Sequence, residues 1–246
     1  MPGNKVTKMP SGTTLFQQMK PLAITAAVIF LALPIIYVGI EYTTSLAFIE
    51  SYSYIKNHTS DLGIPYAYTD PLTNLQTYSY KAQLMRLNFV VNGFLYYIGH
   101  TVLLQATTPL TGGRYNLPRA AVSVIYCLGI VLVAAVPGGP GEKQDGKAVW
   151  HVVGAAMAIV GANVNIILAG LAAPSTTQPV YRGLCLLLGT VGSVGLAIFV
   201  ARHGGGMQGF WQRSSIYPNH VWKFLTGIHL VYLLMQSKTA DAIKRE

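Results

Sequence analysis

The chain has little charge and very little acid. Only 10% of its 246 residues are charged, against roughly 25% in a typical soluble domain, and eight are Asp or Glu. This composition excludes an ordinary soluble domain. The 17 Lys and Arg residues give a net charge of +9. They are spread over short segments and both tails, as membrane anchors and topology signals are, and we therefore exclude nucleic-acid binding.

Cysteine is scarce as well. Cys127 and Cys185 both lie in apolar runs and form no Cys-x-x-Cys pair, which excludes a disulfide framework and a thiolate metal site. We expect both to be buried packing residues. The hydrolase pattern Gly-x-Ser-x-Gly is absent. The run Gly204-Gly205-Gly206 lacks the strand, helix and lysine of a phosphate-binding loop.

Long apolar runs are abundant, since 52% of the residues are hydrophobic. The run from His151 to Ala173 is long enough to cross ~30 Å of hydrocarbon as a helix. Asn163 points away from its neighbour Asn165, which predicts polar neighbours on two sides. Helical spacing places a set of small residues on the face that carries His151 and Asn165, and this predicts a buried central helix. The set is Gly154, Ala155, Ala158, Gly161, Ala162 and Ala169.

Six such runs predict an all-α fold, a polytopic six-helix transmembrane bundle. The segment from Glu41 to Met85 contains seven tyrosines, which predicts a structured outer cap. The cationic first tail places both termini in the cytosol, and the sequon at Asn57 then lies outside, where it could be glycosylated. The predicted spans are 21–40, 86–108, 120–136, 151–173, 183–201 and 220–236, between tails 1–20 and 237–246, with a Gly-rich loop over 202–219.

This topology gathers polar residues from three segments at the outer end of the bundle. Arg213 is the candidate anion contact, because its planar fork suits phosphate or carboxylate, and Tyr217 would lie beside it. Asp61, His151 and His220 are the catalytic candidates, as proton donors or acceptors. Alternatives stay open. Asp61 and Arg213 could form a structural ion pair that clamps two loops, and the two histidines could cap helix starts.

Further polar residues lie deeper. His100 and His229 fall in the second and sixth spans, and together with Asn165 and Trp222 they complete the predicted ligand contacts. Ionisable residues in a membrane are costly and suggest function, although a lone histidine often only bonds a carbonyl or hydroxyl. Haem between His100 and His229 lacks a regular ligand set, and zinc at the outer rim lacks compact ligand spacing. We therefore expect no metal and no cofactor.

Several segments together resemble a known family. They are Ser60-Asp61-Leu62-Gly63, the fourth-span pattern that includes His151, Gly154 and Asn163, and the stretch from Gln212 to Pro218 followed by Trp222 and Gly227. From Pro21 to Gln236 the chain resembles the six-span family catalogued as domain of unknown function nine-nine-eight. That family looks distantly like the damage-regulated autophagy modulators and the membrane factors that remodel the lipid of glycosylphosphatidylinositol anchors. The resemblance implies an integral membrane protein with a lipid connection. The family's acidic residue before the last-loop Arg is Gln212 here.

These observations favour an outward-facing amphipathic pocket that binds or processes a lipid or an isoprenoid-like molecule. One alternative is a membrane-embedded acid/base enzyme, a cyclase, isomerase or transferase acting on an apolar substrate. Another is a non-catalytic interaction or assembly subunit whose polar residues only hold helices together. The expected partner is a membrane lipid or an apolar small molecule. The sequence leaves the oligomeric state open.

Overall fold

The computed structural model describes residues 16, 18–49, 51–69, 74, 76–202 and 205–243. Most of this part of the chain is helical, which confirms the predicted all-α class. The tail before residue 16 and His203 lie outside the described residues. The long helices are α2 (Lys20–Ser45), α3 (Ala82–Thr111), α4 (Asn116–Ala135), α6 (Ala148–Ala172), α7 (Pro179–Ala201) and α8 (Gln208–Ile243). The short elements are η1 (Thr59–Gly63), β1 (Tyr68–Thr69), β2 (Gln76–Thr77) and α5 (Pro140–Gln144).

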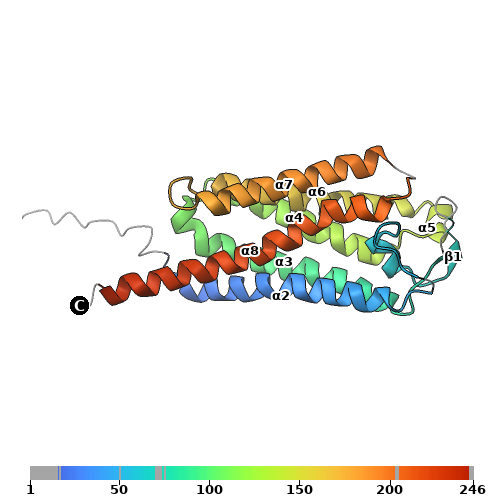
Figure 1. Cartoon of the computed structure of the whole chain (residues 1–246), viewed down its shortest axis with the longest axis horizontal. Coiled ribbons are helices and arrows are strands. Elements are labelled where there is room, and N and C mark those ends of the chain that lie inside the picture. The colour runs from blue at the N-terminus through green and yellow to red at the C-terminus, as the bar shows by residue number, and fades with distance from the viewer. Residues whose placement is uncertain are drawn as a thin grey trace, which may run out of the picture.

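The long helices pack side by side in a ring (Figure 1). Their contacts give the order α2, α3, α4, α6, α7 and α8, and α8 closes the ring against α2. The prediction that the fourth apolar run is a central helix is wrong, because α6 is one member of this ring. Its Val152 and Val160 side chains are exposed on the outside of the bundle.

The small-residue face of α6 is buried as predicted, and it packs against α4. A Cβ atom added to Gly129 of α4 would lie 2.6 Å from the Gly154 carbonyl oxygen of α6, so the two backbones touch. The two asparagines of α6 have separate neighbours, as expected. The Asn165 amide donates to Tyr96 Oη of α3 at 2.6 Å, and the Asn163 amide donates to the Ser215 carbonyl of α8 at 3.1 Å.

A folded cap covers one end of the ring, which we call the cap end. The cap consists of the described residues of the segment 46–81 together with α5, and Figure 1 shows β1 and α5 at this end of the bundle. Strands β1 and β2 pair antiparallel, with Tyr68 opposite Thr77. Tyr52 and Tyr54 meet edge to face, their ring centroids 5.1 Å apart. The expected structured, tyrosine-rich cap is therefore present. The opposite end, where α2 begins and α8 ends, is the tail end.

Five helices in the described part of the chain, α2, α3, α4, α6 and α7, are long and apolar enough to cross a membrane. Helix α8 falls outside this group because its inward face carries polar residues such as Arg213 and Lys223, which lower its mean hydropathy. A stripe of apolar side chains at helical spacing covers its outward face, each between 39% and 65% exposed: Val221, Phe224, Ile228, Val231 and Met235. Such a stripe suits contact with lipid better than contact with water.

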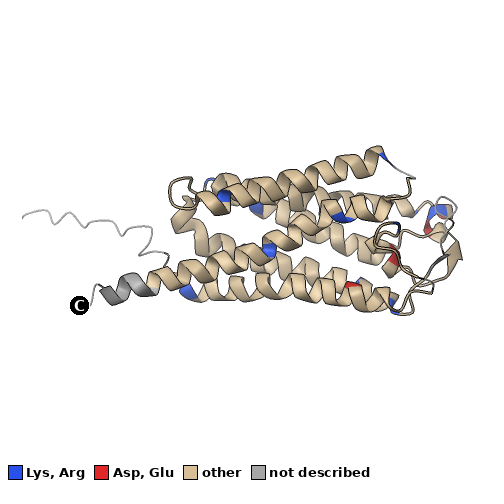
Figure 2. Cartoon of the chain, in the orientation of Figure 1, with Lys and Arg blue, Asp and Glu red and all other residues tan. Residues whose placement is uncertain are grey.

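Charge is unevenly distributed along the bundle. Figure 2 shows the red acidic residues gathered at the cap end, whereas blue basic residues lie at both ends of the coloured part of the chain. Glu41, Asp61, Glu142 and Asp145 all belong to the cap end. The two ends therefore differ in electrostatic character.

The predicted boundaries are least accurate in the last loop. Most of the segment 202–219, predicted as a Gly-rich loop, is helical, because α8 begins at Gln208 and continues for 36 residues. Helix α8 also includes most of the predicted tail 237–246. The alternative that His220 caps a helix start is wrong, since this residue lies in the middle of α8.

Candidate functional site

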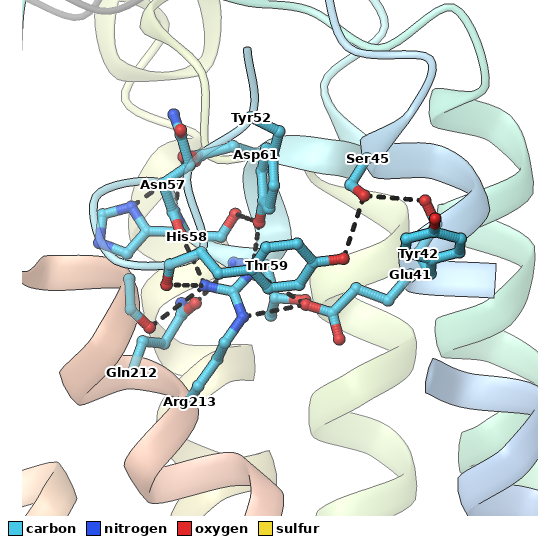
Figure 3. Close-up of polar contacts among 12 residues, drawn as sticks. Glu41, Tyr42, Ser45, Tyr52, Asn57, His58, Thr59, Asp61, Gln212 and Arg213 are labelled. Carbon is cyan, nitrogen blue, oxygen red and sulfur yellow. Dashed lines mark hydrogen bonds and ion pairs between the residues drawn. The ribbon is translucent and has the colours of Figure 1, made fainter. Parts of the chain in front are cut away.

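A buried ion pair joins the first and last long helices beneath the cap (Figure 3). Glu41 of α2 is 1% exposed and Arg213 of α8 is 5% exposed. Arg213 Nε and Nη2 donate to Glu41 Oε1 at 3.1 and 2.9 Å. Thr59 Oγ1 donates to the same oxygen at 2.9 Å, and Tyr217 Oη donates to Oε2 at 3.0 Å. Both oxygens of the Glu41 carboxylate therefore accept hydrogen bonds from protein groups, as a buried charge requires.

The remaining N–H groups of Arg213 hold the cap loop. Nη1 donates to the carbonyl oxygens of Tyr54 at 2.9 Å and Asn57 at 2.8 Å, and it also reaches the Gly209 carbonyl at 3.2 Å. Nη2 also donates to Tyr52 Oη. The guanidinium has five N–H groups, and all of them find acceptors within the protein. This geometry leaves Arg213 no free donor for an anionic ligand, so the side chain fastens the cap to the bundle.

Asp61 lies near this cluster, but it is not the ion-pair partner of Arg213, contrary to that alternative. Its Oδ2 accepts from the His58 backbone N–H at 2.8 Å, and its Oδ1 lies 3.6 Å from His58 Nδ1. The Asp61 carboxylate thus caps the start of η1. The cap tyrosine Tyr52 has a raised pKa because it is buried, with Asp61 and Glu41 adding to the effect and Arg213 opposing it.

Gln212 occupies the position at which the family resemblance leads us to expect an acid. Its Oε1 accepts a hydrogen bond from the Thr59 backbone N–H at 2.8 Å. An amide oxygen fills this role without charge, so the position holds η1 to α8. Asn57 is also buried, and its Oδ1 accepts from the Ser53 backbone N–H at 2.9 Å. The sequon asparagine is therefore not accessible in the folded protein as the structure describes it.

A partly open cavity, the cap cavity, lies inside the ring directly under η1. It has about 550 Å³ of empty space, counting its mouth. Its wall is mostly apolar, with Ile130 of α4 and Ile159 of α6 on one side. The lining comes from α2, α3, α4, α6, α8 and η1. The cavity is therefore built from nearly the whole bundle.

His151 and His220 both line the cap cavity, so the structure brings two of the predicted catalytic residues together. His151 Nδ1 lies 2.7 Å from the Val136 carbonyl oxygen. A carbonyl can only accept, so Nδ1 carries the hydrogen. The His220 ring stacks on Tyr37 with centroids 4.0 Å apart. Within the described part of the chain, His220 Nδ1 and the neighbouring Asn219 Oδ1 are buried without a hydrogen-bond partner.

Lys223 is a residue that sequence reasoning missed. It is 0% exposed and sits one turn beyond Asn219 on α8. Its Nζ lies 3.3 Å from Tyr126 Oη and 4.9 Å from the Tyr96 ring centroid. These contacts are cation–π and hydroxyl contacts, and no ion pair with Lys223 is recorded among the described residues. The spacing of four residues between Asn219 and Lys223 was the available signal, because it places both side chains on the same face of a helix.

The deeper predicted ligand contacts fall in a second group. His100 and Asn165 lie beside Arg119, a buried residue in the first turn of α4 and one position before the predicted third span. Trp222 is fully buried and packs edge to face on Phe30 with centroids 5.6 Å apart. His229 stacks on Tyr181 at the tail end, with centroids 4.2 Å apart. None of these predicted contacts lines the cap cavity.

The apolar exterior, the five candidate membrane spans and the polar interior define a multi-pass integral membrane protein of the helical-bundle class. The chain belongs to the family described as protein of unknown function DUF998, whose model matches residues 24–229. This range begins in α2 and ends in α8, so it includes the cap, the ion pair and the cap cavity. Comparisons with curated proteins and with solved structures gave no match.

Proposed function

We propose that the chain is a six-span membrane protein whose cap cavity binds an amphipathic molecule of the lipid or isoprenoid type. The observation that carries the proposal is a largely apolar cavity whose lining includes Asn219 and His220, two adjacent residues that each have one buried polar atom without a hydrogen-bond partner among the described residues. Ligand cavities in proteins typically combine apolar walls with a few polar groups. The lining of the cap cavity has this character.

The polar atoms suggest how such a molecule would lie. His220 Nδ1 and Asn219 Oδ1 are buried with no partner among the described residues, and a buried polar atom without a hydrogen bond is costly. A hydroxyl or similar group of the ligand would satisfy both. The apolar part of the molecule would then rest against Ile130 and Ile159. Arg213 takes no part in this arrangement, because its donors hold Glu41 and the cap.

The sixth span in this proposal is α8. Its outward apolar stripe supports contact with lipid, and its polar residues face the inside of the ring. With six spans, the two tails share one side of the membrane. The cationic first tail favours the cytosolic side for them and the opposite side for the cap.

This orientation is testable with single cysteines at exposed positions of opposite ends. Leu46 lies at the cap end and Leu117 at the tail end. We expect a membrane-impermeant thiol reagent added to intact cells to label Leu46→Cys and to spare Leu117→Cys until the cells are opened. The native cysteines are both buried and give a low background. Labelling of Leu117→Cys alone in intact cells would show that the orientation is the opposite of the one proposed.

Two adjacent alanines of α6 offer a matched test of ligand binding. Ala155 lines the cap cavity, whereas Ala156 is exposed on the outer surface. Ala155→Leu adds bulk to the cavity without altering a polar group. We expect native mass spectrometry of gently extracted protein to show a bound amphiphile in the wild type and in Ala156→Leu, and to show its loss in Ala155→Leu. Equal retention by both variants would contradict the proposal.

One observation favours a second candidate, an acid/base enzyme acting on the same molecule. Because His151 Nδ1 donates to Val136, its Nε2 carries no hydrogen and can accept one, and His151 lines the cap cavity. An imidazole fixed in this way can remove a proton from a bound substrate. Purified protein incubated with prenyl and acyl lipids would then form a product that His151→Ala does not form. Recovery of the bound lipid without any product would contradict the enzyme and would leave ligand binding as the remaining function.

A further inference from the structure

A second cavity, the tail cavity, lies at the opposite end of the ring. It has about 390 Å³ of empty space, counting its mouth. Leu103 of α3 and Leu230 of α8 belong to its apolar wall, and Arg119, Tyr181 and Thr226 belong to its polar wall. Its lining comes from α3, α4, α6, α7 and α8. None of its lining residues is shared with the cap cavity.

Arg119 is an incompletely paired cation in this wall. It is 3% exposed, yet it has two recorded polar partners. Its Nε donates to Asn165 Oδ1 at 3.3 Å, and its Nη2 lies 3.5 Å from His100 Nε2. Within the described ranges, neither a carboxylate partner of Arg119 nor an acceptor for its Nη1 is recorded. A buried charge is ordinarily paired, as Arg213 is with Glu41.

The tail cavity lies near the ends of α3, α4 and α7. Arg119 is the fourth residue of α4, Tyr181 is the third residue of α7, and Thr107 is four residues before the end of α3. At ~1.5 Å per residue these positions lie within about 8 Å of the helix ends. In a bilayer this is the depth at which hydrocarbon gives way to headgroups. The amino-terminal ends of α4 and α7 add their positive dipole ends to the same region.

We propose that the tail cavity binds a phosphate group through Arg119. The group belongs either to the headgroup of a membrane lipid or to free inorganic phosphate, and both present the same oxygens to the guanidinium. The Nη1 and Nη2 edge can donate two parallel hydrogen bonds to such an oxyanion. The bound phosphate supplies the counter-charge that the described part of the chain does not place beside Arg119. This site is independent of the function proposed for the cap cavity.

The test uses the full chain in an uncharged detergent and isothermal titration calorimetry. The probes are sodium phosphate, with sodium chloride at equal ionic strength as its control, and a short-chain phosphatidic acid, with the matching diacylglycerol as its control. We expect saturable binding of at least one phosphate probe. Binding of both probes identifies phosphate itself as the ligand, and binding of phosphatidic acid alone identifies a lipid headgroup. Loss of two charge-assisted hydrogen bonds predicts that Arg119→Gln weakens binding ~10-fold or more.

Arg114→Gln is the matched charge control, because Arg114 is exposed at the same end and does not line the tail cavity. We expect it to bind as the wild type does. Absence of binding by both phosphate probes, equally tight binding of diacylglycerol, unchanged affinity in Arg119→Gln, or an equal loss in Arg114→Gln would each overturn the proposal.

A second pair of variants keeps the test decisive if Arg119→Gln does not fold. Thr107 and Thr101 both bond the carbonyl four residues earlier in α3, at 2.8 and 2.9 Å, but only Thr107 lines the tail cavity. Thr107→Leu fills the space beside Arg119 and is expected to weaken binding ~10-fold or more. Thr101→Leu is expected to bind normally. Normal binding by Thr107→Leu would overturn the proposal.

Discussion

The ion pair between Glu41 and Arg213 makes the strongest prediction about stability. At about 3 Å and an effective dielectric constant of about 20, two unit charges attract by about 5–6 kcal/mol before desolvation is counted. Removing one partner leaves the other charge buried, and such changes cost about 3–5 kcal/mol. Arg213→Gln also removes the donors that hold the cap loop at Tyr54 and Asn57. We therefore expect this variant to lose about 3–5 kcal/mol of unfolding free energy.

A double-mutant cycle separates the pair from the rest of the cluster. The measurement is reversible unfolding in mixed micelles with increasing dodecyl sulfate, followed by circular dichroism. Glu41→Gln together with Arg213→Gln should cost about 1–3 kcal/mol less than the sum of the single changes. Lys147→Gln, which breaks a fully exposed pair with Asp145, should change nothing measurable. A loss below about 1 kcal/mol for Arg213→Gln, or strict additivity in the cycle, would refute the reasoning.

Two further predictions concern the helix interface and the cap. Gly129→Ala should destabilise the protein by about 1–3 kcal/mol, because its Cβ would meet the α6 backbone. Gly39→Ala is the control in the same unfolding assay, because its Cβ would meet no atom of the described residues within 4 Å. Equal effects of the two changes would argue against close backbone packing. Burial and the hydrogen bond to Glu142 raise the pKa of Tyr66 from 10.0 to about 12. Because the folded pKa is raised, this contact stabilises the cap fully below pH 10 and is lost as the pH rises through 12. Glu142→Gln should move the titration of Tyr66 toward lower pH. The titration is followed by phenolate absorbance, as the difference between the protein with Tyr66 and the Tyr66→Phe variant. An unchanged titration would contradict the contact between Tyr66 and Glu142.

The helical class and the gathering of polar residues at one end could be predicted from the sequence, because they follow from local patterns. The length of an apolar run predicts a membrane span, and residues spaced three and four apart predict one face of a helix. The buried face of small residues on α6 was therefore predictable. The position of α6 in a ring was not predictable, since its valines were equally compatible with burial against other helices. The start of α8 at Gln208 was missed because glycines and polar residues suggested a loop.

The identity of the ion pair was also beyond the sequence. Arg213 and Glu41 are 172 positions apart, and Asp61 was an equally reasonable partner by topology alone. Glu41 went unrecognised because it ends an apolar run, where an acid usually marks the return to water. Lys223 and Arg119 were missed for a related reason. Both lie close to the start of a predicted span, where a cation is ordinarily an interfacial anchor, and only packing reveals that these two are buried.

A density map of the gently extracted protein tests the central proposal most directly. The account predicts an elongated molecule in the cap cavity, with its apolar part against Ile130 and Ile159 and a polar end within hydrogen-bond distance of His220 or Asn219. A cap cavity that holds ordered water only, in protein that was never exposed to delipidating conditions, would contradict the proposed function.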